Sequence, residues 1–283
     1  IKDLYDPSKA IPLAHLSKYI YVLALAANSS TAPNSNTDSN TNNSTNAQQP
    51  TGQQPQQLHQ QRMTLLTQGI QTTVQICSNK SSPVNLTKSV TVLRKYLSMS
   101  VVALGVLHWI MVVFADSEHS VSVYTMNNTK MYMSLLKEIA YLHMPLRPDV
   151  LHVVHKCFGM KNDLDALHAV EIKRVYLEVF LYLLQLGYVI PTMKTLNQIV
   201  KDQLDLALIR GLVTQLIEMI EEPYSEQFVD LFVDILCTTH AVDSLKKISG
   251  TLRPFVQHVL HSSVHKAHLS PANLKILSEY LNS

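Results

Sequence analysis

The chain has 283 residues, of which 46% are hydrophobic, 16% charged and 7% aromatic. Its 23 basic and 21 acidic side chains leave a formal net charge of only +2, so any attraction to nucleic acid must come from a local cluster. Only 7 residues are glycine, and the apolar residues fall in long runs rich in Leu, Val and Ile. This composition favours an all-α fold over a β-sandwich or a Rossmann-type enzyme.

The first 61 residues divide into two segments of opposite character. Residues 13–27 have the apolar spacing of an amphipathic helix, and we expect 1–27 to be the end of a longer helical part. Residues 28–61 are dominated by Asn, Ser, Thr and Gln, with Asp38 as the only Asp, Glu, Lys or Arg. Such a segment cannot bury enough apolar surface to become ordered, so a disordered insertion is predicted there. A tolerated loop expansion explains it most simply, and a condensate-forming tract is the alternative.

From residue 62 onward, the spacing of apolar residues predicts a succession of helices. The predicted ranges are 62–77, 84–97, 99–115, 130–144, 149–158, 167–187, 190–203, 205–221, 224–237, 252–266 and 271–282. Short connections indicate antiparallel helical pairs stacked as an α-solenoid, with a helical-repeat domain over 62–268 and an extra helix within 269–283. Ser270 and Pro271 have the order of a helix cap and a first-turn proline. The best strand-like stretch, 120–124, is too isolated to build a sheet.

The stretch 97–115 contains no Asp, Glu, Lys or Arg and has two interpretations. It is close to the length of a membrane span, with basic residues before it and acidic residues after it. However, Ser98, Gly105 and His108 interrupt it, and the neighbouring predicted helices are amphipathic. A central helix of an α-solenoid can be apolar all round, so the sequence favours a buried helix over a membrane anchor.

No motif for catalysis or cofactor binding is present: the chain has no GxSxG, no glycine-rich phosphate loop and no HExxH. His258, His261, His265 and His268 follow at intervals of three, four and three, which would place the first three on one helical face. No carboxylate or cysteine lies within the run to complete a zinc site, so a polar helix stripe is favoured. We therefore expect no catalytic residue, no metal and no cofactor. The cysteines Cys77, Cys157 and Cys237 are widely spaced and suit a reducing compartment.

Two sets of charged residues are candidates for partner contacts. The acidic candidates fall within 218–234 and are Glu218, Glu221, Glu222, Glu226, Asp230 and Asp234. They predict either a solvated face or a surface for a basic partner. The basic candidates for nucleic acid are Lys88, Arg94, Lys95 and Arg210, with Lys246, Lys247 and Arg253 nearer the C-terminus. None is interleaved with aromatic residues that could stack on bases, so a solvated helix face is the alternative for each.

Several segments, in the same order, resemble the C/D subunit family of the negative elongation factor. They are HLSKYIYVLALAA at 15–27, VVALGVLHW at 101–109, LLKEI at 135–139, RPDVLHVVHKCF at 147–158, LLQLGYVIP at 183–191 and LALIRGLVTQLIEMIEEPYSEQFVDLFVDIL at 205–235. The family is soluble, which argues further against a membrane anchor. The segment 269–283 has no counterpart in this resemblance.

The resemblance implies a HEAT-like, non-enzymatic scaffold that acts in the nucleus and stabilises promoter-proximally paused RNA polymerase II. It implies contacts with the A and B subunits, with the polymerase and with single-stranded RNA. Lys18 and Arg210 lie in matched segments and would contribute to a basic surface. The Asn/Gln-rich insertion stands where the family has several lysines, which weakens the expectation of RNA binding from this part. Because fold does not fix function, a general helical-repeat adaptor with an unrelated partner is the alternative, and a membrane protein anchored by 97–115 is a weaker one.

Overall fold

The computed structural model describes residues 86–115, 125–160, 165–202, 205–237 and 252–282, together with part of the stretch 61–76. The chain divides into two compact units, Ile1–Val113 and Phe114–Ser283, and each is considered by itself. All regular secondary structure in the described residues is helical, as predicted. The expectations for 1–27, for 28–61 apart from Gln61, and for the strand-like stretch 120–124 fall outside the described residues.

The first unit contains helix α3 (Leu86–Arg94) and most of helix α4 (Ser100–Ala115). The described residues between 61 and 76 are also helical, which agrees with the predicted helix there. Gly69 lies close to the chain after α3: a Cβ at this position would stand 3.1 Å from Tyr96 Cδ1 and 3.2 Å from Met99 Sδ. A side chain at residue 69 would therefore push these neighbours away.

Helix α4 makes up most of the apolar stretch 97–115. Its buried side chains, all at most 6% exposed, are Val102, Ala103, Val106, Leu107, Trp109, Ile110 and Phe114. The polar His108 is only half-buried. The prediction of a buried helix is therefore confirmed over Ser100–Ala115. Within the described residues, no helix has the length and apolar character needed to cross a membrane.

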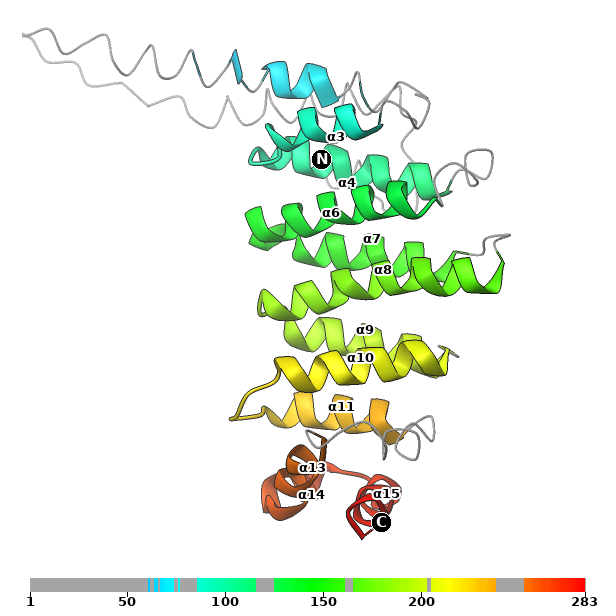
Figure 1. Cartoon of the computed structure of the whole chain (residues 1–283). Coiled ribbons are helices and arrows are strands. Elements are labelled where there is room, and N and C mark those ends of the chain that lie inside the picture. The colour runs from blue at the N-terminus through cyan, green and yellow to red at the C-terminus, as the bar shows by residue number, and fades with distance from the viewer. Residues whose placement is uncertain are drawn as a thin grey trace, which may run out of the picture. The chain divides into compact units, whose positions relative to one another are not determined.

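The second unit is an array of paired helices. Figure 1 shows α6 (Met126–Leu142), α7 (Arg147–Gly159), α8 (Ala166–Gln185), α9 (Val189–Lys201), α10 (Leu206–Met219) and α11 (Glu226–Cys237) side by side in chain order. A 3₁₀ turn, η4 (Met144–Leu146), joins α6 to α7. Helix α8 contacts α6, α7, α9 and α10, and α9 also packs against α11. The predicted array of antiparallel helical pairs is confirmed.

Among the described residues, three helices follow α11: α13 (Leu252–His261), α14 (Ser263–His268) and α15 (Pro271–Asn282). The single helix predicted over 252–266 is wrong, because the chain breaks at Ser262. There the Ser262 hydroxyl accepts a hydrogen bond from His265 N at 3.3 Å and caps a new helix. The histidine run is therefore divided between α13 and α14 and does not follow one helical face.

Local capping explains where several helices begin and end. Asp165 caps α8 by accepting a hydrogen bond from His168 N at 2.9 Å. At the other end of α8, Gly187 has a φ of +83°, and Tyr188 N donates to Leu183 O at 3.0 Å. This pattern is a Schellman motif, in which glycine adopts the left-handed conformation without strain.

Arg147 ties three helices together at the turn between α6 and α7. Its Nε donates to Ala140 O at 3.1 Å, and its Nη1 donates to Leu186 O at 2.8 Å. These carbonyls lie at the C-terminal ends of α6 and α8, where carbonyls lack helical donors and carry partial negative charge. One guanidinium at the start of α7 thus fixes the spacing of α6, α7 and α8.

Candidate interaction surface

The acidic candidates lie on the end of α10, on the link that follows it, and along α11. Glu218, Glu221, Glu222 and Glu226 are exposed, whereas Asp230 and Asp234 are half-buried. Helix α11 buries Phe228 and Phe232, and Asp234 on the same helix is partly covered by its contacts with α9 and α15. Ser225 starts the helix by accepting a hydrogen bond from Phe228 N at 3.3 Å.

Two of these glutamates contact the histidine run. Glu222 Oε1 lies 3.2 Å from His258 Nδ1, and Glu226 Oε2 lies 3.2 Å from His268 Nε2. Tyr224, between the two glutamates in sequence, stacks edge-on against His258 with ring centroids 5.1 Å apart. The acidic stretch and the histidines therefore form one surface that joins the start of α11 and the link before it to α14 and α13.

The histidines show no arrangement suited to a metal. The rings of His258 and His265 lie with their centroids 5.9 Å apart, while His261 Nδ1 lies 2.7 Å from Gln257 O of its own helix. Among the described residues, no group of three or more His, Cys, Asp or Glu side chains could hold a metal ion.

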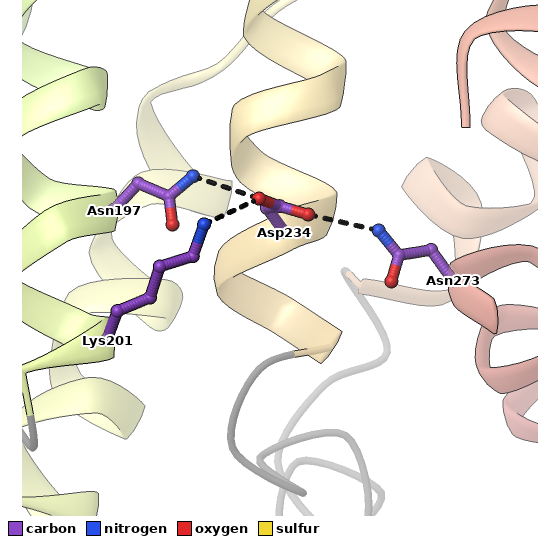
Figure 2. A network of polar contacts seen from close by, with 4 residues as sticks. All are labelled: Asn197, Lys201, Asp234 and Asn273. Carbon is purple, nitrogen blue, oxygen red and sulfur yellow. Dashed lines mark hydrogen bonds and ion pairs between the residues drawn. The ribbon is translucent and has the colours of Figure 1, made fainter. Parts of the chain in front are cut away.

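Asp234 is the centre of a polar network that connects three helices (Figure 2). Its Oδ2 accepts hydrogen bonds from Asn197 Nδ2 at 3.2 Å and Lys201 Nζ at 3.0 Å, both on α9. Its Oδ1 accepts one from Asn273 Nδ2 of α15 at 3.1 Å. Partial burial by itself raises the pKa of Asp234, but the hydrogen bonds from Lys201, Asn197 and Asn273 and the charge of Lys201 together hold it below its ordinary value. Its carboxylate is thus engaged by α9 and α15.

Two other candidates also have polar atoms turned into the protein. Asp230 Oδ1 and Arg210 Nε are buried and have no hydrogen-bond partner among the described residues. Both side chains are half-buried overall. Four exposed glutamates, Glu218, Glu221, Glu222 and Glu226, therefore make up the accessible part of the acidic candidate set, which we call the glutamate surface.

The basic candidates do not all belong to one unit. Lys88 and Arg94 are exposed on α3, and Lys95 is exposed in the turn after it, all in the first unit. We call these three residues the α3 basic cluster. Arg210 belongs to the second unit, and Lys18 lies outside the described residues.

The structure also shows an apolar candidate that sequence reasoning missed. Tyr141, Leu142 and Met144, at the turn between α6 and α7, are 65%, 42% and 71% exposed. Residues 141–146 read YLHMPL and are mostly apolar, so the spacing of apolar residues gives no sign that Tyr141, Leu142 and Met144 are exposed. Only Pro145, which ends the helical pattern at this point, could have indicated an exposed turn.

The comparisons with known proteins identify the family. Residues 1–266 match the family model described as TH1 protein. The chain is 27% identical over 264 residues to negative elongation factor D of Mus musculus and 26% identical over 264 residues to negative elongation factor D of Sus scrofa. Each alignment covers 92% of this chain but 41% of the relative, so the chain spans less than half of their length. The predicted resemblance to the C/D subunits of the negative elongation factor is thus confirmed. The chain belongs to the TH1 protein family, whose model matches 266 of its 283 residues.

Proposed function

We propose that this chain is a non-enzymatic scaffold portion of a negative elongation factor complex, which acts in the nucleus and supports promoter-proximal pausing of RNA polymerase II. The observation that carries the proposal is the family match over residues 1–266, which runs through both units. An extended helical array suits this role, since it presents exposed side chains from successive helices to several partners. The partners we propose are subunits A and B and RNA polymerase II.

Co-expression with the N-terminal region of the A subunit tests this function. We expect the two chains to co-purify as an equimolar complex that persists through gel filtration. The Asn/Gln-rich segment gives a suitable control: a variant without residues 28–61 should form the same complex if partner contacts come from the helices. Recovery of both chains in separate fractions, each folded, would overturn the proposal.

Within this function, we propose that the glutamate surface meets a basic surface of a partner subunit. Charges at the rim of an interface mainly change the association rate and its salt dependence. Glu218→Lys combined with Glu221→Lys should therefore slow association, most strongly at low salt. Glu171→Lys on α8 combined with Glu279→Lys on α15 is the matched control, because both glutamates are exposed and the net charge changes by the same amount. Equal association rates for the double variant and the control would show that the glutamate surface is not part of the interface.

We further propose that Tyr141 and Met144 supply an apolar contact to the same complex. Large apolar side chains exposed together are typical of protein interaction sites. Tyr141→Ser with Met144→Ser should accelerate dissociation of the complex while leaving the fold intact, because both side chains lie outside the core. Unchanged dissociation would exclude this turn from the interface.

Single-stranded RNA is a proposed ligand of the α3 basic cluster. Each phosphate contact to single-stranded nucleic acid contributes about −0.7 to the slope of log affinity against log salt. Replacing Lys88, Arg94 and Lys95 together by Glu should weaken binding of a mixed-sequence RNA and reduce this slope by up to roughly 2. Lys275→Glu on α15 is the control. An unchanged slope in the triple variant would show that RNA does not bind at this cluster.

The alternative function is a helical adaptor for an unrelated partner. This alternative is supported by the coverage of the relatives. The chain covers 41% of their length, and their interactions can depend on the other 59%. A pull-down from nuclear extract separates the two functions: RNA polymerase II and elongation factor subunits should be enriched under the first, and a different dominant protein under the second.

A further inference from the structure

Three turns of the second unit lie along one edge of the helical array. They join α6 to α7, α8 to α9 and α10 to α11, and Figure 1 shows them on the same side of the array. Neighbouring helices of each pair run in opposite directions, so every second connection returns to this side. We call these three connections, residues 141–147, 185–191 and 218–224, the turn edge.

Side-chain contacts hold the three turns next to one another. Arg147 Nη1 in the first turn donates to Leu186 O in the second turn at 2.8 Å. Gln185 Nε2 in the second turn donates to Met219 Sδ in the third turn at 3.8 Å. The turn edge is therefore one continuous surface, although its three parts are far apart in the sequence.

The turn edge is apolar from α6 as far as α9. Tyr141 and Met144 in the first turn are 65% and 71% exposed, and large apolar side chains exposed together are typical of interaction sites. The second turn contains no Asp, Glu, Lys or Arg. Its half-buried side chains are Leu186, Tyr188, Val189 and Ile190. A ligand on these two turns therefore meets an apolar surface.

The third turn is acidic. Glu218, Glu221 and Glu222 are exposed there, and residues 218–224 contain no Lys or Arg. Glu222 also contacts His258, so we assign Glu218 and Glu221 to a ligand. The other charged side chain of the turn edge is Arg147, whose guanidinium already donates to two backbone carbonyls. The turn edge thus changes from apolar to negatively charged along its length.

We propose that the turn edge binds one extended segment of a partner protein, which carries large apolar side chains at one end and a pair of Lys or Arg side chains at the other. Packed helices lie about 8–10 Å apart, so the two steps from α6 to α10 cover about 16–20 Å. An extended chain spans about 3.3–3.6 Å per residue, so about five or six residues separate the two groups. This inference rests on the proposed function, since it gives the chemistry of the partner that contacts Tyr141, Met144 and the glutamate surface.

A single segment suits this surface better than two unrelated ligands do. The apolar side chains supply contact area, and the glutamates attract basic side chains and favour one orientation of the segment. Once one half of the segment is bound, binding of the other half becomes intramolecular, which raises the overall affinity without any new contact. The continuity of the three turns allows both halves to bind at once.

A library of random peptides about twelve residues long, selected on the full chain, tests the proposal without assuming a direction of binding. We expect the enriched peptides to carry two large apolar residues and a Lys or Arg pair at the separation given above. Peptides that hold only the apolar half or only the basic half should bind about tenfold more weakly, or less, than the whole peptide. Absence of enrichment, enrichment without this pattern, or equal affinity of the whole peptide and the apolar half would each overturn the proposal.

Two double variants place the selected peptide on the turn edge. Tyr141→Ser with Met144→Ser should weaken its binding about tenfold or more at every salt concentration, as measured by fluorescence anisotropy. Glu218→Lys with Glu221→Lys should weaken binding most at low salt. Unchanged affinity in either double variant, with helical circular dichroism preserved, would overturn the proposal.

Matched controls separate these effects from changes in charge or apolar area elsewhere. Glu171→Lys with Glu279→Lys gives the same change in net charge, and Leu167→Ser removes a side chain that is 72% exposed on α8. Neither control should change the affinity for the peptide. Peptide binding without co-purification of the A subunit would contradict only the proposed function, whereas co-purification without peptide binding would contradict only this inference.

Discussion

Replacing Asp234 by Ala should destabilise the second unit through three separate hydrogen bonds. The substitution removes the acceptor of Asn197, Lys201 and Asn273. The same substitution leaves the apolar face of α11 unchanged, so its effect reports on the polar network alone. We expect the largest loss at Asn197, because this residue is only 6% exposed and water cannot replace the carboxylate there.

The magnitude follows from the burial of each partner. A buried donor left without an acceptor costs about 1–3 kcal/mol, which applies to Asn197. The half-buried Asn273 contributes about 0.5–1.5 kcal/mol. The Lys201 pair is 46% and 41% exposed, and solvent screening limits its contribution to about 0–1 kcal/mol. The expected loss in the free energy of unfolding is therefore about 1.5–5.5 kcal/mol.

Urea unfolding followed by circular dichroism at pH 7 measures this loss. Asp202→Ala is the matched control: Asp202 is exposed directly after α9 and accepts side-chain hydrogen bonds only from Gln198 of that helix among the described contacts. We expect the control to cost less than about 0.5 kcal/mol. Equal losses for Asp234→Ala and Asp202→Ala would refute the assignment of Asp234 as the centre of a stabilising network.

The pH dependence gives an independent check. The pKa of Asp234 is lowered in the folded protein, so its stabilising contribution is complete above the unfolded-state pKa of about 3.9 and disappears as pH falls through the folded-state pKa. The difference in stability between the unaltered chain and Asp234→Asn should shrink on acidification below about pH 4. A difference that grew in this range would contradict the sign of the shift.

Three further predictions concern the rest of the fold. Arg147→Ala should lower the free energy of unfolding by about 1–3 kcal/mol because two helix-end carbonyls lose their donors, and Arg147→Lys should recover only part of it, as urea unfolding can show. Ile110→Ala should cost about 2–5 kcal/mol, since Ile110 is fully buried in α4, whereas Val112→Ala on a half-exposed position should cost less; equal thermal shifts would contradict the burial pattern. Burial raises the pKa of Cys157 to about 12, so in a Cys77→Ser, Cys237→Ser background a thiol reagent at pH 8 should modify it only as fast as the protein unfolds; rapid labelling of the native chain would contradict this.

The sequence predicted helices well where apolar residues recur on one face. Helix α11 is an example, because Phe228 and Phe232 mark its buried side directly. Helix α6 begins at Met126, four residues earlier than the predicted start at 130. Its first turn buries Asn128 and Thr129, which are polar, so apolar periodicity gives no signal there. The cap by Thr125, whose side chain accepts from Asn128 N at 3.4 Å, fixes the true start.

The contacts of the candidate surface were harder to predict from the sequence than the helices were. The sequence marked the acidic residues and the histidines separately, but Glu222 in the link before α11 contacts His258 of α13, and Glu226 of α11 contacts His268 of α14. Likewise, nothing near Asp234 in the sequence indicates that Asn197 and Asn273 bind its carboxylate. Such contacts depend on how helices distant in sequence are packed, and side-chain type and local spacing do not encode that packing.

The most direct test of the scaffold role is crosslinking mass spectrometry of nuclear complexes isolated with this chain as bait. We predict crosslinks to elongation factor subunits A and B and to RNA polymerase II, with lysines such as Lys194 and Lys201 of α9 among the sites on this chain. Abundant crosslinks to an unrelated protein, with none to these subunits or to the polymerase, would contradict the account.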